Sequence, residues 1–180
     1  MDWISPTGRK IVLKEGDITR VAAGAIVNAA NSALAGGGGV DGAIHRAGGP
    51  AIMRELDAVR REIGRCPTGS AVATGVGNLP ARFVFHVVGP VYRDGRRGEP
   101  ELLASCYRKA FDLAEERQVE TISFPAISTG VYGYPLEDAA QIAVREVKAA
   151  LERPGSPVRE AIFVLFGRAA FDIYAALLKD

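Results

Sequence analysis

The sequence places a carboxylate and an imidazole where they could act together. Asp41 and His45 are four residues apart in the segment 40–47. If this segment is helical, the two side chains share one face and can form a general acid/base couple. The alternative is a carboxylate that stabilises a helix N-terminus, with His45 simply packed. His86, the other histidine, lies in an apolar run and is predicted to be a core residue with satisfied hydrogen bonds.

Four consecutive glycines, residues 36–39, come just before this segment. Their conformational entropy favours a site where something approaches the bare main chain closely. Because helix N-termini present free N–H groups, these glycines predict a phosphate-binding loop, with a flexible linker as the alternative. Gly37, Gly39 and Gly42 match the dinucleotide pattern G-x-G-x-x-G, but the acidic position that this pattern needs falls near Glu62, in a charged helical stretch. An ordinary dinucleotide-binding fold therefore fits poorly, and no P-loop motif is present.

A second glycine-bearing loop has the sequence Ser-Thr-Gly-Val-Tyr-Gly-Tyr-Pro at residues 128–135. It follows an apolar run and precedes a helical pattern, so it is a second candidate for phosphate binding. Two such loops could clamp a diphosphate between them. Tyr132 and Tyr134 flank Gly133, and each could either stack on a sugar or base or cover an edge of the core.

Three further polar side chains lie close to predicted strand ends. Asp17 could accept a hydrogen bond from an exocyclic amine while a neighbouring backbone N–H donates to a ring nitrogen, although a role in stabilising a turn is the simpler reading. Asn28 and Asn31 could orient a hydroxyl near the glycine loop, or serve as turn or cap residues. The arginines at 93, 96 and 97 are predicted to form a solvated loop, with a nucleic-acid contact as the weaker alternative.

The elements that must position these residues alternate along the chain. Apolar β-type runs predict strands at residues 10–14, 25–28, 70–74, 83–88, 121–124 and 161–166, and helical periodicity predicts helices at 40–47, 50–63, 102–114, 136–151 and 171–178. The runs 70–74 and 83–88 form either a strand pair or a short crossover. This alternation predicts a three-layer α/β/α sandwich with a largely parallel sheet. Ligands of such sheets bind outside the carboxyl ends of the strands.

Length and charge limit the class of protein. The 180 residues, 48% of them hydrophobic, predict one globular domain spanning 1–180. The 22 basic and 21 acidic residues are too balanced for binding that rests on phosphate neutralisation, so nucleic acid is not expected as a partner. Cys66 and Cys106 show no zinc-ligand spacing, so neither a metal nor another cofactor is expected. With no apolar run of membrane-spanning length and no secretory segment, we expect a cytoplasmic protein.

Taken together, the motifs resemble those of the MacroD-type macrodomains, a family that binds ADP-ribose. The resemblance covers about residues 11–178 and is carried by four segments in order: Gly-Asp-Ile-Thr at 16–19, Asn-Ala-Ala-Asn at 28–31, the stretch from the four glycines to 49, and Phe-Pro-Ala-Ile-Ser-Thr-Gly-Val-Tyr-Gly at 124–133. It implies a mixed central sheet between helices, with ADP-ribose in a cleft across the strand ends.

The resemblance also implies a role for each loop. Asp17 would receive the adenine amine, the Ile18 backbone would meet the ring, and Phe166 would stack on adenine where many relatives have tyrosine. Asn31 would orient a hydroxyl of the distal ribose, Asp41 would position or deprotonate a water, and His45 would act from behind them. The diphosphate would lie between two backbone segments, one formed by Gly38, Gly39 and Val40, the other by Ser128, Thr129, Gly130, Val131 and Tyr132, with Tyr132 covering the distal ribose.

The implied activity is hydrolysis of esters at the distal ribose. MacroD-type relatives remove mono-ADP-ribose from acidic side chains of proteins and deacetylate O-acetyl-ADP-ribose, so the expected partners are ADP-ribose, its esters and mono-ADP-ribosylated proteins. One alternative is a reader that binds ADP-ribose without turnover, and another is a phosphatase acting on ADP-ribose-1″-phosphate. The presence of both Asn31 and Asp41 favours the esterase, because a reader needs no water-positioning carboxylate.

Overall fold

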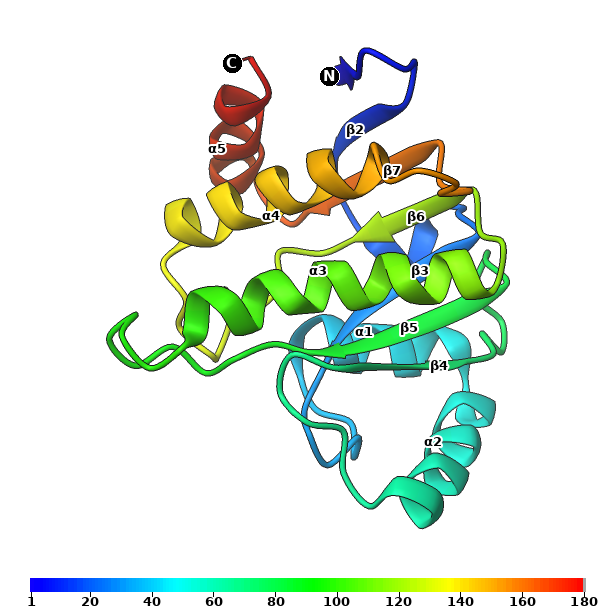
Figure 1. Cartoon of the computed structure of the whole chain (residues 1–180). Helices are drawn as coiled ribbons and strands as arrows, with labels where there is room; N and C mark the ends of the chain where they lie inside the picture. The colour runs from blue at the N-terminus through cyan, green and yellow to red at the C-terminus, as the bar shows by residue number, and fades with distance from the viewer. Residues whose placement is uncertain (180) are drawn as a thin grey trace.

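A seven-stranded mixed sheet forms the centre of the structure, a computed structural model that describes residues 1–179 (Figure 1). The strand order is β1-β2-β7-β6-β3-β5-β4. The five central strands are parallel, whereas the two edge strands, β1 and β4, each run antiparallel to their neighbour. The strands are β1 (Asp2–Ile4), β2 (Lys10–Glu15), β3 (Ala25–Ala30), β4 (Ala71–Thr74), β5 (Phe83–Val88), β6 (Thr121–Phe124) and β7 (Glu160–Leu165).

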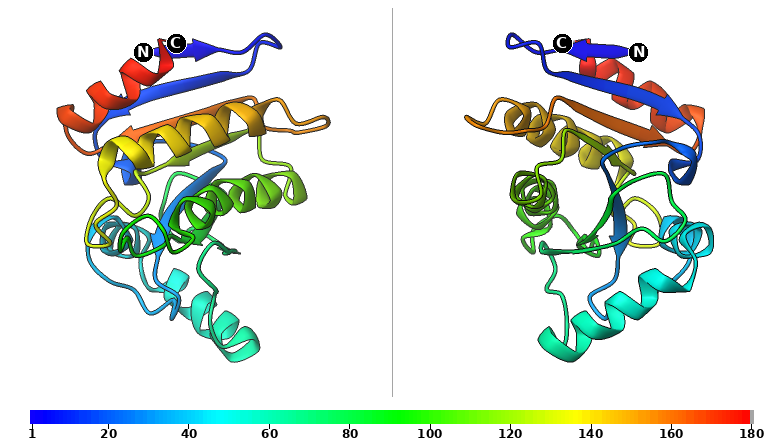
Figure 2. Two further views of the ribbon diagram at one scale, coloured as in Figure 1. Left: turned by 60° about the vertical axis from the view of Figure 1, so that its left-hand side comes forward. Right: turned by 90° about the vertical axis from the view of Figure 1, so that its right-hand side faces the viewer.

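Helices cover both faces of this sheet, which confirms the predicted sandwich (Figures 1 and 2). The helices α3, α4 and α5 pack on one face through a core that includes Tyr107, Phe124 and Tyr174. The helices α1 and α2 pack on the other face, where Ile44 and Ile52 meet the strand residues of a second core. Their bounds are α1 (Gly39–Gly48), α2 (Pro50–Ile63), α3 (Glu99–Glu116), α4 (Leu136–Leu151) and α5 (Arg168–Leu178), and a short 3-10 turn spans Ile18–Arg20.

Three strand assignments go beyond the prediction. Strand β1 was not predicted, because it has only three residues and, of its two apolar side chains, Trp3 is partly buried and Ile4 is exposed. Strand β3 continues to Ala30 instead of stopping at Asn28. The strands β4 and β5 pair antiparallel, with Ala71 opposite Val87. The eight residues between them are too few for a parallel crossover, which needs a dozen or more.

The topology brings four loop starts to one edge of the sheet. The strands β2, β7, β6 and β3 are neighbours and run parallel, so their carboxyl ends lie side by side. At about 4.8 Å per strand spacing, the loops after β2 and β3 are separated by about 14 Å across the sheet.

Among residues 1–179, no helix is long and apolar enough to cross a membrane.

Candidate functional site

The glycine loop ends as the N-terminus of α1. Gly38 is the N-cap residue and makes no side-chain cap, while Gly39 adopts a left-handed conformation with φ of +58°. Within the described chain, the backbone N–H groups of Gly38, Gly39 and Val40 donate no hydrogen bond. These are the groups that a helix start leaves unsatisfied and that bind anions when they point at a cleft.

The second loop, after β6, is held in shape by its own backbone. Tyr134 N–H donates to Ser128 C=O at 2.9 Å, Gly133 N–H donates to Gly130 C=O at 3.0 Å, and Ser128 has a positive φ of 66°. The four amide groups between these anchors, those of Thr129, Gly130, Val131 and Tyr132, donate no hydrogen bond to any residue that the structure describes. Strands β6 and β3 are neighbours, so the loops that carry the two sets of unpaired N–H groups begin at adjacent strand ends.

Two apolar side chains on this second loop and after the neighbouring strand β7 are exposed to solvent. Val131 is 100% exposed, and Phe166, directly after β7, is 92% exposed. Tyr132 is half-buried, whereas Tyr134 is buried and packs on Tyr92 with 4.8 Å between ring centroids. Of the two tyrosines, Tyr134 therefore covers an edge of the core, and Tyr132 is the one left at the surface of the loop.

At the end of β2, Asp17 closes a turn with one of its carboxylate oxygens. Asp17 Oδ1 accepts from the Thr19 backbone N–H at 2.9 Å and from Thr19 Oγ1 at 2.7 Å. These hydrogen bonds, the hydroxyl one foremost, lower the pKa of Asp17. The turn role that the residues alone favoured is thus real. Among residues 1–179, the other oxygen, Oδ2, has only Arg20 as a partner, at 3.8 Å. It remains able to accept a hydrogen bond from a ligand.

Asp41 is buried near the start of α1 and is held from behind by an asparagine of β3. Its Oδ1 accepts from Asn28 Nδ2 at 2.8 Å, and both residues are buried. The prediction that Asp41 and His45 share a helix face is confirmed, because His45 Nε2 lies 3.3 Å from the same oxygen. Within the described residues Asp41 Oδ2 has no hydrogen-bond partner, so one oxygen of the carboxylate remains able to accept a hydrogen bond.

A chain of buried hydrogen bonds continues from Asn28 across the sheet. Asn28 lies opposite His86 on β5, and Asn28 Nδ2 is 3.0 Å from His86 Nδ1. His86 Nε2 is 2.9 Å from Thr74 Oγ1, and this hydroxyl donates to Gly75 C=O at 2.8 Å. Burial, with a smaller contribution from His45, lowers the pKa of His86 to about 3, so the ring is neutral above about pH 4.

Neutrality fixes the direction of every hydrogen bond in this chain. His86 Nδ1 must accept from Asn28, so His86 Nε2 carries the proton and donates to Thr74. The amide of Asn28 then donates one hydrogen to His86 and the other to Asp41. The expectation of a satisfied core histidine is confirmed, and in addition His86 orients the amide that holds Asp41.

Asn31 is tied to the glycine loop. Its Nδ2 donates to Gly36 C=O at 2.9 Å, and its Oδ1 accepts from Ala35 N–H at 3.2 Å. A Cβ placed on Gly37 would lie 3.9 Å from Asn31 Nδ2 and 3.6 Å from Asp41 Oδ2. Asn31 therefore shapes the loop and lies near Asp41, with one Nδ2 hydrogen left for a ligand.

A buried glutamate organises the loop next to the second glycine loop. Glu99 accepts backbone N–H hydrogen bonds from residues 93, 94, 95 and 97, the Arg93 bond being the main reason that the pKa of Glu99 falls to about 2. Tyr92 N–H, at the start of this loop, donates to Tyr132 C=O at 2.8 Å. The side chains of Arg93, Arg96 and Arg97 are exposed, as predicted for a solvated loop.

Sequence reasoning found the loops and Asp41 but missed their support. Nothing in the spacing of Asn28, Thr74 and His86 indicates that they meet, because the pairing of β3, β5 and β4 decides it. Glu99 was also missed, and the only signal was an acidic residue directly after a glycine- and arginine-rich loop. In the part of the chain that the structure describes, no three His, Cys, Asp or Glu side chains lie close enough together to hold a metal ion.

This architecture defines an α/β domain with two sets of unpaired backbone donors, in loops that follow neighbouring strands, and a buried carboxylate beside one of them. The comparison with known sequences narrows the class further, because the pattern of the Macro domain matches residues 27–143. The chain belongs to the macro domain family.

Named relatives are similar over almost the whole chain. A macro domain-containing protein of Caldanaerobacter subterraneus subsp. tengcongensis, TTE0995, is 54% identical over 95% of this chain and 97% of its own length. O-acetyl-ADP-ribose deacetylase 1 of Pantoea vagans is 49% identical over 95% of this chain and 99% of its own length. Among solved structures, the Oceanobacillus iheyensis macrodomain with ADP has a TM-score of 0.93 at 40% identity, covering 99% of this chain and 94% of that one.

Proposed function

We propose that the protein binds ADP-ribose across the strand ends and hydrolyses esters at its distal ribose. The substrates would be O-acetyl-ADP-ribose and mono-ADP-ribose attached to acidic side chains of proteins. The observation that carries this proposal is the buried Asp41 carboxylate, fixed through Oδ1 and open at Oδ2, directly beside the unpaired N–H groups at the start of α1. The name of the Pantoea vagans relative and the ADP in the Oceanobacillus iheyensis structure agree with it.

In this proposal the order of the strand ends sets the order of the ligand. Adenine lies at β2 and β7, where Asp17 Oδ2 accepts from its amine, the Ile18 backbone meets the ring and Phe166 stacks on its face. The diphosphate accepts hydrogen bonds from the N–H groups of both glycine loops. The distal ribose then reaches Asn31 and Asp41 at β3, covered by Tyr132.

The reaction needs one water and one base. Asp41 Oδ2 accepts a proton from a water whose oxygen attacks the acyl carbonyl carbon. As the bond between this carbon and the ribose oxygen breaks, the ribose oxygen takes the proton back from Asp41. The products are a free carboxylic acid and ADP-ribose. Fixing the water and the ester side by side supplies much of the rate, because both reactants are held in place before the reaction.

The direct test measures binding and turnover on one preparation. Calorimetry with free ADP-ribose should show a saturable site, and O-acetyl-ADP-ribose should release acetate in proportion to enzyme. A protein mono-ADP-ribosylated on glutamate should release ADP-ribose in the same assay. Binding without release from either ester would indicate a reader and contradict the esterase, while the absence of binding would contradict the whole assignment.

We also propose a cytoplasmic site of action. The buried and unpaired Cys66 and Cys106 agree with it, because disulfides are rare in the reducing cytoplasm.

We expect His86→Phe to lower kcat about 5-fold to 10-fold while the Kd for ADP-ribose stays unchanged. The substitution removes the acceptor that fixes the Asn28 amide, so Asp41 is held less firmly, but no predicted ligand contact is lost. Steady-state kinetics and calorimetry on the same protein measure the two quantities.

The control for this substitution is Val84→Ala. Val84 is also fully buried on β5, two residues away, and its truncation destabilises the same region of the core without touching Asn28. If Val84→Ala lowers kcat as much as His86→Phe does, the effect is general destabilisation and the positioning role of His86 is wrong.

A further inference from the structure

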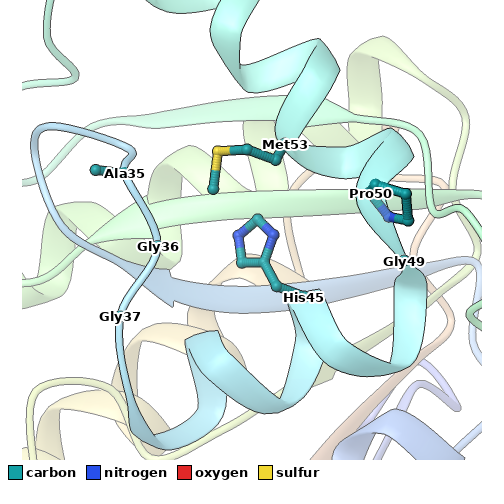
Figure 3. Close-up of a pocket in the computed structure, with 7 residues that line it drawn as sticks. All are labelled: Ala35, Gly36, Gly37, His45, Gly49, Pro50 and Met53. Carbon is teal, nitrogen blue, oxygen red and sulfur yellow. The ribbon is translucent and has the colours of Figure 1, made fainter.

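A hollow lies between the glycine loop and the helices α1 and α2, and opens beside the proposed catalytic pair. It has a volume of about 330 Å³, at the lower end of the range for ligand pockets. Its walls come from the loop, from α1 and from the first turn of α2 (Figure 3). The residues that line it are Ala35, Gly36, Gly37, His45, Gly49, Pro50 and Met53.

The lining of this hollow is mostly apolar. Ala35, Pro50 and Met53 contribute hydrocarbon and thioether surface, and the three glycines contribute bare main chain. Figure 3 shows the Met53 side chain and the His45 ring next to each other, between the loop and α2. Such a surface suits an aliphatic group and offers little to a phosphate or a sugar, so it differs from the donor-rich cleft.

Met53 is held in place as one wall. Arg60 Nη1 contacts Met53 Sδ at 3.6 Å and donates to Leu34 C=O at 2.5 Å, which ties α2 to the start of the loop. A Cβ on Gly36 would lie 3.3 Å from Met53 Cε. The distance between loop and helix is therefore set by the absence of a side chain at Gly36 and by the reach of Met53.

The hollow and the proposed catalytic pair share a boundary. Gly37 lines the hollow, and a Cβ on this residue would lie within 4 Å of both Asp41 Oδ2 and Asn31 Nδ2. His45 also lines the hollow, and its Nε2 lies 3.3 Å from Asp41 Oδ1 without forming a hydrogen bond. A group joined to an oxygen near Asp41 can thus pass over bare backbone at Gly37 into the hollow.

We propose that this hollow holds the aliphatic part of the ester's acyl group, beyond the carbonyl carbon. The proposal rests on the proposed function and specifies its substrates as esters with short unbranched acyl chains. Two sources share this chemistry: small acyl esters of ADP-ribose, and the side-chain methylenes of a modified glutamate. Because the hollow is open to solvent, a longer chain can continue outward to a protein backbone.

The test compares acetyl, propionyl and butyryl esters of ADP-ribose. In the wild type, kcat/KM should rise by up to about fourfold for each added methylene, the ratio that corresponds to burying one CH₂ group. In Met53→Trp, which fills the hollow, the rise should disappear and the butyryl ester should become a poorer substrate than the acetyl ester. Met53→Leu, with a similar volume, should keep the wild-type order.

A matched control carries the same new side chain elsewhere on α2. Ile63→Trp adds tryptophan at the exposed end of the helix, outside the hollow, and should leave the chain-length order unchanged. An ADP-ribosylated glutamate peptide, assayed with all variants, distinguishes small acyl esters from a modified glutamate as the occupant. If Met53→Trp slows cleavage of this peptide too, both kinds of acyl chain occupy the hollow. If the wild type, Met53→Trp and Ile63→Trp share one butyryl-to-acetyl ratio, the hollow does not receive the acyl group.

Binding measurements keep this test separate from that of the esterase itself. In the Asp41→Ala background, the Kd of the butyryl ester should be lower than that of the acetyl ester, and adding Met53→Trp should abolish the difference. The Kd of free ADP-ribose, which has no acyl group, should not change with Met53→Trp. If Met53→Trp leaves the Kd values of both esters unchanged, the acyl site is wrong even if turnover is found. If the Kd difference between the esters depends on Met53 but the wild type shows no turnover, only the esterase is contradicted.

Discussion

Asp41→Ala should lower kcat for ester hydrolysis about 10³-fold and change the Kd for ADP-ribose less than threefold. The size of the kinetic loss is that typical of removing a general base. Affinity should survive because the proposed diphosphate contacts are backbone N–H groups, which the substitution leaves in place. Acetate release from O-acetyl-ADP-ribose, followed with calorimetry on the same variant, measures both effects.

Asp41→Asn separates the two roles of this carboxylate. An amide oxygen can still orient a water, but it cannot take its proton at neutral pH, so a loss as large as that of Asp41→Ala identifies Asp41 as the base. Asp138→Ala is the control, because Asp138 is also the third residue of its helix, α4, but is exposed to solvent. Full turnover in Asp41→Ala would show that this carboxylate serves only the start of α1.

Asp17→Asn should weaken ADP-ribose binding about 30-fold. The asparagine oxygen can replace Oδ1 in the turn with Thr19, so the fold of the turn is kept. Its amide nitrogen then takes the place of Oδ2 and presents a donor to the adenine amine, which is also a donor. Losing a hydrogen bond to a charged acceptor is worth about 1.5–3 kcal/mol, which corresponds to about 10-fold to 150-fold in Kd.

Thr19→Val supplies the control for the turn. It removes the hydroxyl that donates to Asp17 Oδ1 but leaves the carboxylate intact. We expect a change in Kd of less than threefold, as measured by calorimetry. Equal affinities for wild type and Asp17→Asn would mean that Asp17 is only a turn residue and that the adenine end is recognised differently.

The elements that could be predicted are those with a strong local pattern. The helices at 50–63 and 136–151 have the predicted bounds, because proline at one start and regular apolar spacing leave little ambiguity. Strand β1 could not be predicted, since its pairing with β2 depends on a contact with the rest of the sheet rather than on its own residues. The sequence analysis left open whether β4 and β5 form a strand pair or a crossover, and the short connection between them decides for antiparallel pairing.

The same distinction between local pattern and tertiary contact applies to the candidate site. The loop glycines and Asp41 were visible because backbone freedom and the spacing of Asp41 from His45 are local properties of the sequence. The support behind Asp41 was invisible, because Asn28, His86 and Thr74 come from three strands whose register aligns them. The hollow beside Met53 was equally invisible, since it depends on the distance between a loop and a helix.

The donors of the candidate site belong to the main chain, and this affects how the site can change. No single side-chain truncation can delete the N–H groups of residues 38–40 or 129–132, and no shift of pH within the physiological range can titrate them. If these groups bind the diphosphate as proposed, evolution can vary the side chains of the loops while anion recognition persists. By the same argument, a lineage can lose the proposed catalysis at Asp41 and still retain a working binding module.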